Sequence, residues 1–310
     1  MSSTADASAV ASGDAARLRP LRKVAEQALV RRLQETRSDV LGSKNRAQAL
    51  AAVLVPGIPG DELKAALVDI AAGDGGELKW AGSLPPKLHS AYSSAGLVLN
   101  TFARWRLHPQ SLRIDDQCDF TELRFEVKLA IFEEPVGAPN LDLVLRRGGG
   151  FAHGVESKVT EFLEPKNAQG SDRYEQACEK LAHRSWRARY DELRANPARF
   201  SFLNAAQLVK HYLGIKRDLV TCRTGVTAAT LLYLYWEPED ADAWPQFSAH
   251  RAEIVAFAAD LADPEVKFRA LGYRELWASW LGDGDERLRD HVDALRARYD
   301  VRLGTSDTAL

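Results

Sequence analysis

Three ionisable residues, Asp142, Glu156 and Lys158, stand at a spacing that could do chemistry. Thirteen residues separate the aspartate from the glutamate, and the lysine follows the glutamate by two. Side chains two residues apart on a strand point to the same face, so Glu156 and Lys158 share a face if their segment is extended. A Gly-rich turn at 148–150 joins two apolar runs, and the resulting hairpin would bring Asp142 beside that pair.

Two carboxylates and a lysine at one point suit cleavage of a phosphodiester. The carboxylates of Asp142 and Glu156 are hard oxygen ligands for Mg²⁺, and the carbonyl of Ser157 could add a third oxygen. A bound Mg²⁺ would neutralise a phosphodiester and lower the pKa of a bound water. Lys158 would orient that water and offset transition-state charge. The alternative is a solvated edge strand, but the apolar flanks favour the chemical interpretation, because buried charges are costly unless paired or used.

These residues resemble the PD-(D/E)xK nuclease superfamily, which has the restriction-endonuclease-like fold. The motif of that superfamily is Pro-Asp, a variable gap, and then Asp or Glu, any residue, and Lys. Asp142 matches the first acid, Glu156 the second acid and Lys158 the lysine. The sequence departs from the motif at its proline, since Pro139 stands three residues before the acid.

Further segments are similar to one uncharacterised bacterial branch of this superfamily, and they extend the resemblance over residues 87–282. They are the segment 93–100, Phe125-Glu126, VESKVTEFL at 155–163, AQLVKHYLGI at 206–215 and LLYLYW at 231–236. The superfamily often has another acid on the helix that precedes the strands, but no acid lies within 87–107.

The missing acid has two nearby substitutes, Glu122 and Glu126, and Glu126 is the better candidate to point toward the site. Its alternative role is that of a solvated strand residue. By analogy with the superfamily, Gln176 and Tyr174 on the helix after the third strand are candidates to lie near the metal, although surface exposure or core packing explains both as well. Glu161 is a weaker candidate, for which a surface role is expected.

A basic segment at 180–217 carries nine Lys or Arg residues against Asp191 and Glu192, with three aromatic residues interleaved. Such a segment suits contact with a phosphate backbone. The candidates for nucleic-acid binding are Arg184, Arg187, Arg189 and Lys210, and the aromatic residues are Trp186, Tyr190 and Phe200. The alternative is a set of solvated helix faces.

Other catalytic patterns are missing from the sequence. It has no Gly-rich phosphate loop, GxSxG elbow, HExxH motif or Cys/His nucleophile pair. His211 could contact a phosphate, but packing explains it better, and His153 has no assigned role. The three cysteines include no CxxC pair, which argues against a structural zinc site and suits a cytoplasmic protein.

The hydropathy pattern predicts helices first, then three strands, then helices, a fourth strand and further helices. Helices are expected at 14–36, 61–72, 87–107, 171–195, 203–213, 246–262, 265–281 and 285–297, and strands at 121–132, 141–145, 151–159 and 228–236. In the first strand, period-two alternation places Leu123, Phe125, Val127 and Leu129 on one face and Glu126 on the other. The third and fourth strands are joined through helices and should be parallel.

The expected fold class is therefore α/β, with a restriction-endonuclease-like core. A mixed central sheet of about four to five strands would be flanked by helices. The expected regions are a disordered tail at 1–12, a helical region at 13–80, a nuclease-like domain at 81–300 and a C-terminal tail at 301–310. The chain has 310 residues and a formal net charge of −2, so binding to nucleic acid would need a local basic patch.

The resemblance implies a Mg²⁺-dependent nuclease that hydrolyses DNA, of the restriction type, with Mn²⁺ as a substitute ion. Asp142, Glu156 and Ser157 would hold the metal, Lys158 would assist the attacking water, and Glu126 and Gln176 are further catalytic candidates. The alternative is an inactive nucleic-acid-binding or protein-interaction module that keeps the fold. DNA is the expected partner and RNA stays an alternative. A homodimer is left open, and no membrane partner is expected because no stretch reaches about 18 apolar residues.

Overall fold

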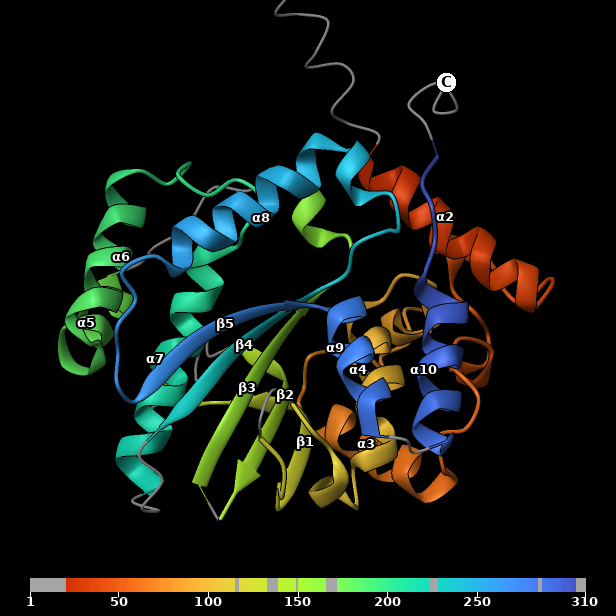
Figure 1. Ribbon diagram of the computed structural model, residues 1–310, viewed down its shortest axis with the longest axis horizontal. Coiled ribbons are helices and arrows are strands. Elements are labelled where there is room, and N and C mark those ends of the chain that lie inside the picture. Colours follow the sequence, from red (N-terminus) through yellow and green to blue (C-terminus); the bar gives the residue numbers. More distant parts are fainter. Residues whose placement is uncertain are drawn as a thin grey trace, which may run out of the picture.

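The computed structural model describes residues 21–114, 117–132, 139–148, 150–165, 172–222, 228–283 and 286–304, apart from the side chains of Cys222 and Asp283. A central sheet lies between two layers of helices (Figure 1). The predicted tail at 1–12, the end of the second predicted tail and the turn at 133–138 lie outside the described residues. None of the described helices combines the length and the apolar character that a membrane span requires.

The sheet has five strands in the order β1-β2-β3-β4-β5. They are β1 (Glu122–Lys128), β2 (Asn140–Arg147), β3 (Gly150–Lys158), β4 (Ala229–Tyr235) and β5 (Val266–Gly272). The first three strands form an antiparallel meander, and β4 and β5 continue the sheet parallel to β3. The predicted α/β class, the mixed sheet flanked by helices and the helical N-terminal region are confirmed.

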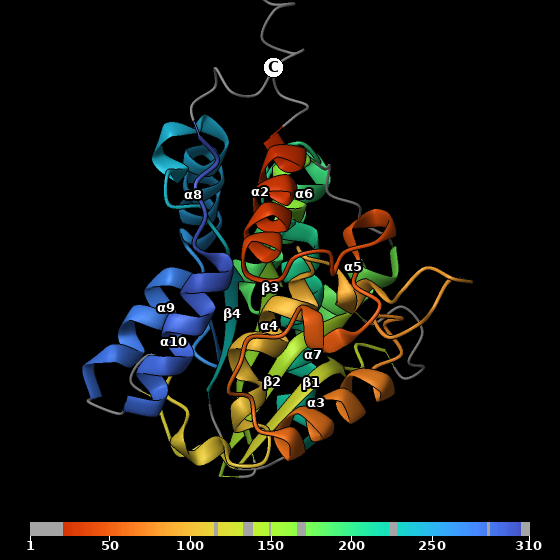
Figure 2. The ribbon, with the colours of Figure 1, turned by 90° about the vertical axis from the view of Figure 1, so that its right-hand side faces the viewer.

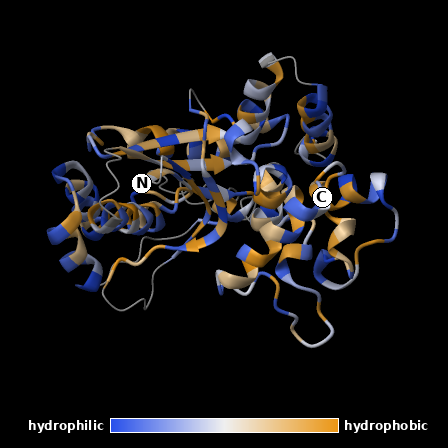
Figure 3. Cartoon of the chain, turned by 90° about the horizontal axis from the view of Figure 1, so that it is seen from below, coloured by the Kyte–Doolittle hydropathy of each residue, from blue (hydrophilic) through white to orange (hydrophobic). Residues whose placement is uncertain are grey.

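Helices cover the two faces of the sheet in separate groups (Figures 1 and 2). One group is α2 (Leu21–Thr36), α3 (Gly60–Ala72), α4 (Ser94–Phe102), α9 (Tyr273–Ser279) and α10 (Glu286–Tyr299). The other is α5 (Asp172–Leu181), α6 (Arg184–Ala195), α7 (Ala205–Cys222) and most of α8 (Pro245–Ala258). Each group buries its apolar residues in its own cluster against the sheet. Figure 3 shows hydrophobic residues along the central strands and hydrophilic residues on the outer helices.

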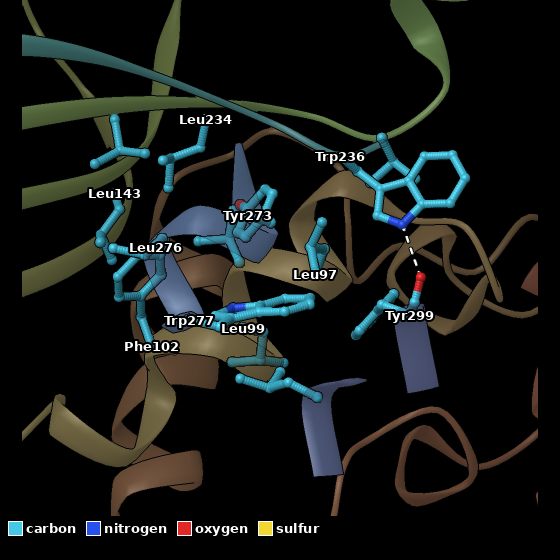
Figure 4. Packing of buried hydrophobic residues seen from close by; sticks show 14 of the residues in the cluster. Leu97, Leu99, Phe102, Leu143, Leu234, Trp236, Tyr273, Leu276, Trp277 and Tyr299 are labelled. Atoms are coloured by element: carbon cyan, nitrogen blue, oxygen red, sulfur yellow. Dashed lines mark hydrogen bonds between the residues drawn. The ribbon is translucent and has the colours of Figure 1, made fainter. Parts of the chain in front are cut away.

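The α4/α9/α10 side of the sheet has the larger of the two clusters. Trp236, which follows β4, and Trp277 on α9 are both fully buried there (Figure 4). The indole Nε1 of Trp236 donates a hydrogen bond to the carbonyl oxygen of Tyr299 at 2.9 Å, which ties the end of β4 to the end of α10. Val301 and Leu303, within the predicted C-terminal tail, are also buried in this cluster.

Three predicted helices differ in the structure. Residues 266–272 form β5, because this half-buried segment pairs with β4 along its whole length and tertiary pairing overrides its helical pattern. The helix predicted at 87–107 is limited to Ser94–Phe102, where the side chain of Ser93 caps it by accepting from Gly96 N at 3.0 Å. The helix predicted at 171–195 is two helices, α5 and α6, with His183 capping the second.

The His153 side chain on β3 is a fully buried imidazole without a hydrogen-bond partner among the described residues. Its ring contacts that of Phe120 edge-on, with centroids 5.6 Å apart. Burial, together with the charges of Arg147 and Arg269, lowers the pKa of His153 to about 4. The folded protein therefore holds this residue neutral at a pH at which the unfolded chain protonates it.

We predict that His153 makes the protein sensitive to mild acid. Its contribution to stability is complete above the unfolded pKa of 6.5 and is lost as the pH falls toward 4. At pH 5 the loss amounts to roughly 2 kcal/mol. His153→Leu should therefore lose less unfolding free energy than the natural chain between pH 7.5 and pH 5.0, as measured by urea denaturation. Equal losses in the two proteins would contradict the prediction.

Candidate active site

The hairpin of β2 and β3 brings Asp142 next to Glu156 and Lys158. The last paired residues of the two strands are Leu143 and Val155. Beyond this pair, a side chain replaces the backbone hydrogen bond between the strands: Asp142 Oδ2 accepts from Ser157 N at 2.6 Å. The hydrogen bond fixes the aspartate at the point where the two strands separate.

The Glu156 carboxylate is 2% exposed and lies between two basic side chains. Lys158 forms an ion pair with Oε1, and Nε2 of His211 on α7 lies 2.8 Å from Oε2. Burial alone would raise the pKa of Glu156, but the neighbouring Lys158 and His211 overcome it and hold the pKa at about 2. Burial likewise opposes the charge of Lys158, yet Glu156 and other nearby acids raise the pKa of the lysine. Glu156 is thus an anion and Lys158 a cation at neutral pH.

Glu126 lies opposite Asp142, but the predicted geometry of its strand is wrong. Phe125 packs in the cluster beside α4, whereas Val127 packs in the cluster beside α7, so the two point to opposite faces. The alternation breaks because Glu126 has a φ of 51°, a left-handed conformation that a regular strand does not contain. The pairs Phe125–Leu143 and Val127–Leu141 enclose this irregularity.

The C-terminal end of α3 holds Glu126 in this conformation. A Cβ on Gly73 would lie only 2.4 Å from the carbonyl oxygen of Glu126 and 2.5 Å from its Cβ. Asn140 joins the two segments, since its Nδ2 donates to Gly73 O at 2.7 Å and to Glu126 Oε2 at 3.2 Å. Burial, and then the charges of Glu77 and Glu156, raise the pKa of Glu126 to about 7, although Asn140 and Lys158 act in the opposite direction.

Burial and the crowding of carboxylates together set the electrostatics of this site. Burial raises the pKa of Asp142 well above its usual range, and Glu156 and Glu126 raise it further. Lys158 and the hydrogen bond from Ser157 N oppose the shift without cancelling it. The nearby positive charge does not fully neutralise these carboxylates, and such a set of oxygen ligands suits a hard divalent cation. In the described part of the chain, however, no three His, Cys, Asp or Glu side chains lie close enough together to hold a metal ion.

The other residues predicted around the motif have different surroundings. The hydroxyl of Ser157 lies on the opposite face of β3 and is 2.7 Å from the hydroxyl of Tyr273, so only the Ser157 backbone is directed toward Asp142. Glu161 accepts hydrogen bonds from Val159 N at 2.7 Å and Thr160 N at 3.0 Å. It therefore shapes the turn that follows β3 rather than lying free on the surface.

Glu122, Tyr174 and Gln176 lie in other surroundings. Glu122 pairs with Arg124 at 2.9 Å, at the start of β1. Tyr174 packs edge-on against Phe132, with ring centroids 5.4 Å apart. Gln176 is exposed on α5, a helix that packs against α6 and α7.

Most of the predicted basic face is engaged within the protein. Arg187 lies within 4 Å of Glu175, Glu179 and Asp191. Arg189 pairs with Glu192 and donates to the carbonyls of Ala256 and Ala259. The Nζ of Lys210 lies 4.7 Å from the centre of the Tyr174 ring. Arg184 is exposed at the start of α6.

The aromatic residues of the basic segment belong to the core. Trp186, Tyr190 and Phe200 are at most 5% exposed. The Trp186 ring stacks on that of Tyr212 with centroids 4.0 Å apart. The prediction that they interleave with the basic residues on a nucleic-acid-binding face is therefore wrong, because the apolar face of α6 is buried against α7 and α8.

The sequence alone does not predict the roles of His211, Asn140 and Gly73. The sequence favours a packing role for His211, because a separation of 55 positions from Glu156 leaves no local signal of their contact. Asn140 stands two residues before Asp142, and the Gly-rich run after α3 could have indicated a close backbone approach. Only the packing of α3 on β1 shows where that approach occurs.

Comparison with known proteins gives one family. Residues 61–300 match the family model described as restriction endonuclease associating with ARP. The match includes α3, all five strands and the helices through α10. Searches among curated proteins and among solved structures found no match.

We predict that Gly73→Ala destabilises the protein and displaces Glu126. The new methyl group would overlap the Glu126 backbone, so β1 and α3 would have to separate, at a cost of about 1–3 kcal/mol. Urea denaturation would measure this cost. Gly60→Ala is the matched control at the start of α3, where a new Cβ would meet no atom within 4 Å. Similar effects of the two substitutions would contradict the proposed close approach.

We predict that His211 stabilises the protein through Glu156. His211→Leu would leave a buried carboxylate with one polar partner fewer and should lower the unfolding free energy by about 1–3 kcal/mol. His211→Gln keeps an N–H donor on a side chain of similar reach and should recover part of the loss. Equal destabilisation by leucine and glutamine, measured by urea denaturation, would show that the contact with Glu156 is not responsible.

Proposed function

Because this chain belongs to the family described as restriction endonuclease associating with ARP, we propose that it is a Mg²⁺-dependent nuclease that hydrolyses DNA phosphodiester bonds. The observation that supports the proposal best is the gathering of Asp142, Glu156 and Lys158 where β2 and β3 separate. The hydrogen bond from Ser157 N holds the first acid beside the strand that carries the other two. The PD-(D/E)xK motif that these residues resemble is part of the same proposal.

Asp142 and Glu156 are the proposed metal ligands, with Glu126 as a further acid and the carbonyl of Ser157 as a neutral donor. When bound, Mg²⁺ would supply a polarised water and compensate the charge of the phosphate. The chain's own contribution is to keep several carboxylates together in a buried site in spite of their repulsion. Mn²⁺ is the proposed substitute ion, because it accepts the same oxygen ligands.

Lys158 acts through its charge in this proposal. Its pKa is raised by Glu156 and other nearby acids, so it stays protonated and does not serve as a general base. A lysine held in this state donates hydrogen bonds to the attacking water or to a phosphate oxygen. Gln176 remains a weaker candidate, since it is exposed on α5.

DNA is the proposed substrate, with RNA as the alternative. Arg184 is exposed at the start of α6, whereas Arg187, Arg189 and Lys210 would first have to leave their partners within the protein to bind a phosphate. Neutralising one phosphate contact should reduce the salt dependence of binding by about one unit of slope.

A second candidate function is DNA binding without cleavage. It is favoured by the engagement of both Glu156 oxygens, one by Lys158 and the other by His211. In this function the same three residues would be a structural ion-pair cluster, and the fold would serve as a binding module.

We predict that Asp142→Asn and Lys158→Met each reduce cleavage of plasmid and linear DNA about 100-fold or more. Asparagine keeps an oxygen acceptor for Ser157 N, so the asparagine variant should stay folded while it loses a charged metal ligand. Cleavage is measured with Mg²⁺, with Mn²⁺ and with a chelator, and activity should require the metal. Circular dichroism and thermal denaturation check that each variant is folded.

The control for this experiment is Asp242→Asn, the same change at a side chain that is 91% exposed and pairs with Arg251. It should cleave as the natural chain does. DNA binding without metal-dependent cleavage by the natural chain would favour the binding module. Cleavage that survives both site substitutions would place the catalytic residues elsewhere.

A further inference from the structure

A pocket of about 130 Å³ opens beside Lys158, on the α7 side of the sheet. Tyr233 of β4 also lines it, and its register partner on β3 is Glu156. The pocket therefore lies on the neighbouring strand, directly beside Glu156 of the carboxylate cluster. A substrate group that enters it would lie next to any phosphate that Lys158 contacts.

One wall of the pocket is a loop held rigidly by a single carboxylate. Glu253 on α8 accepts hydrogen bonds from the backbone N–H groups of Ser201, Phe202 and Leu203, each at 2.8 Å. Ser201 and Phe202 both line the pocket. The Phe202 ring is half-buried, so an aromatic side chain is held at the wall before any ligand arrives.

The N-terminal end of α7 directly follows this loop and adds the amide side chains of Asn204 and Gln207 to the lining of the pocket. Asn204 Oδ1 accepts from Gln207 N at 3.3 Å, and Asn204 Nδ2 donates to Gln207 Oε1 at 3.0 Å. This pair sets the orientation of the Gln207 amide in the pocket wall. His211, one helical turn further along α7, contacts Glu156, so a single face of the helix extends from the pocket to the cluster.

The charges of the lining select the ligand class. Glu161 and Glu164 line the pocket together with Lys158. Although Glu164 also pairs with Arg22, the two carboxylates disfavour a phosphate inside the pocket. They can accept hydrogen bonds from a neutral group with polar edges, and the amides can donate or accept them. An aromatic wall with such groups beside a cationic lysine suits a planar base attached to a phosphate.

We propose that this pocket receives one nucleobase of the DNA substrate, next to the phosphate at which cleavage occurs. The inference rests on the proposed nuclease function and adds a substrate position to it. Phe202 supplies a surface for stacking, and Gln207 supplies a hydrogen-bonding edge. A base in this position is unpaired, so the pocket selects for single-stranded or locally opened DNA.

The test uses a DNA duplex with a short central unpaired stretch, so that binding requires no opening of base pairs. A single abasic nucleotide is moved through the unpaired strand, and binding is measured by fluorescence anisotropy with Ca²⁺ in place of Mg²⁺. The natural chain should bind about tenfold more weakly when the abasic nucleotide occupies one particular position. Cleavage of the intact probe with Mg²⁺ should map next to that position.

Two substitutions connect this position to the pocket. Gln207→Leu and Phe202→Ala should each weaken binding of the intact probe and should largely abolish the extra loss caused by the abasic nucleotide at that position. Gln34→Leu, the same change as the first at an exposed position of α2, is the matched control and should retain the natural profile. Thermal denaturation verifies that all three variants are folded.

The outcomes separate this inference from the proposed function. If the natural chain cleaves DNA but shows no position-specific abasic effect, or if the effect persists in both pocket variants, the base pocket is overturned and the nuclease stands. If the natural chain neither binds nor cleaves DNA, the proposed function fails and the pocket assignment fails with it. A position-specific effect that disappears only in the pocket variants supports the inference.

Discussion

A carboxylate buried inside a sheet is the constraint on which the rest of this structure depends. Glu156 is almost inaccessible to solvent, and a buried charge without partners would cost several kcal/mol. Its two partners come from different elements, Lys158 from the same strand and His211 from α7. Gly154 permits this arrangement, because a Cβ there would lie 3.0 Å from a methyl group of Ile215 on α7. Close packing of α7 on β3 is thus a condition for keeping Glu156 ionised.

The second requirement is to hold further acids near that charge. Regular strands would direct Glu126 and Asp142 by simple alternation, but the alternation of β1 breaks at Glu126. The end of α3 and the amide of Asn140 maintain this conformation. Burial first, and then the repulsion of the neighbouring acids, raises the pKa values of Asp142 and Glu126. Functional sites commonly concentrate such shifts.

Basic residues near this site form ion pairs with acids of the same chain, so they do not make a surface with an excess of positive charge. Arg187 and Arg189 of α6 bind acids of α5 and α6, and Arg189 also donates to a carbonyl of α8, whereas Arg184 is exposed. The pocket beside Lys158 is instead lined by neutral amides, aromatic rings and two carboxylates. If DNA binds here as proposed, contacts to a base would contribute beside contacts to phosphates. This division follows because Lys158, Arg187 and Arg189 are paired with acids of the chain itself.

The sequence by itself determined the α/β class, the order of the first four strands and the local relation between Glu156 and Lys158. Strand periodicity and tight turns are short-range signals, and the family match agrees with the fold that they indicate. Only the tertiary structure decided that residues 266–272 form a strand, that Phe125 and Val127 face opposite ways and that His211 reaches Glu156. Those outcomes depend on contacts between residues far apart in the chain, where the burial of apolar faces and charged groups outweighs local conformational preference.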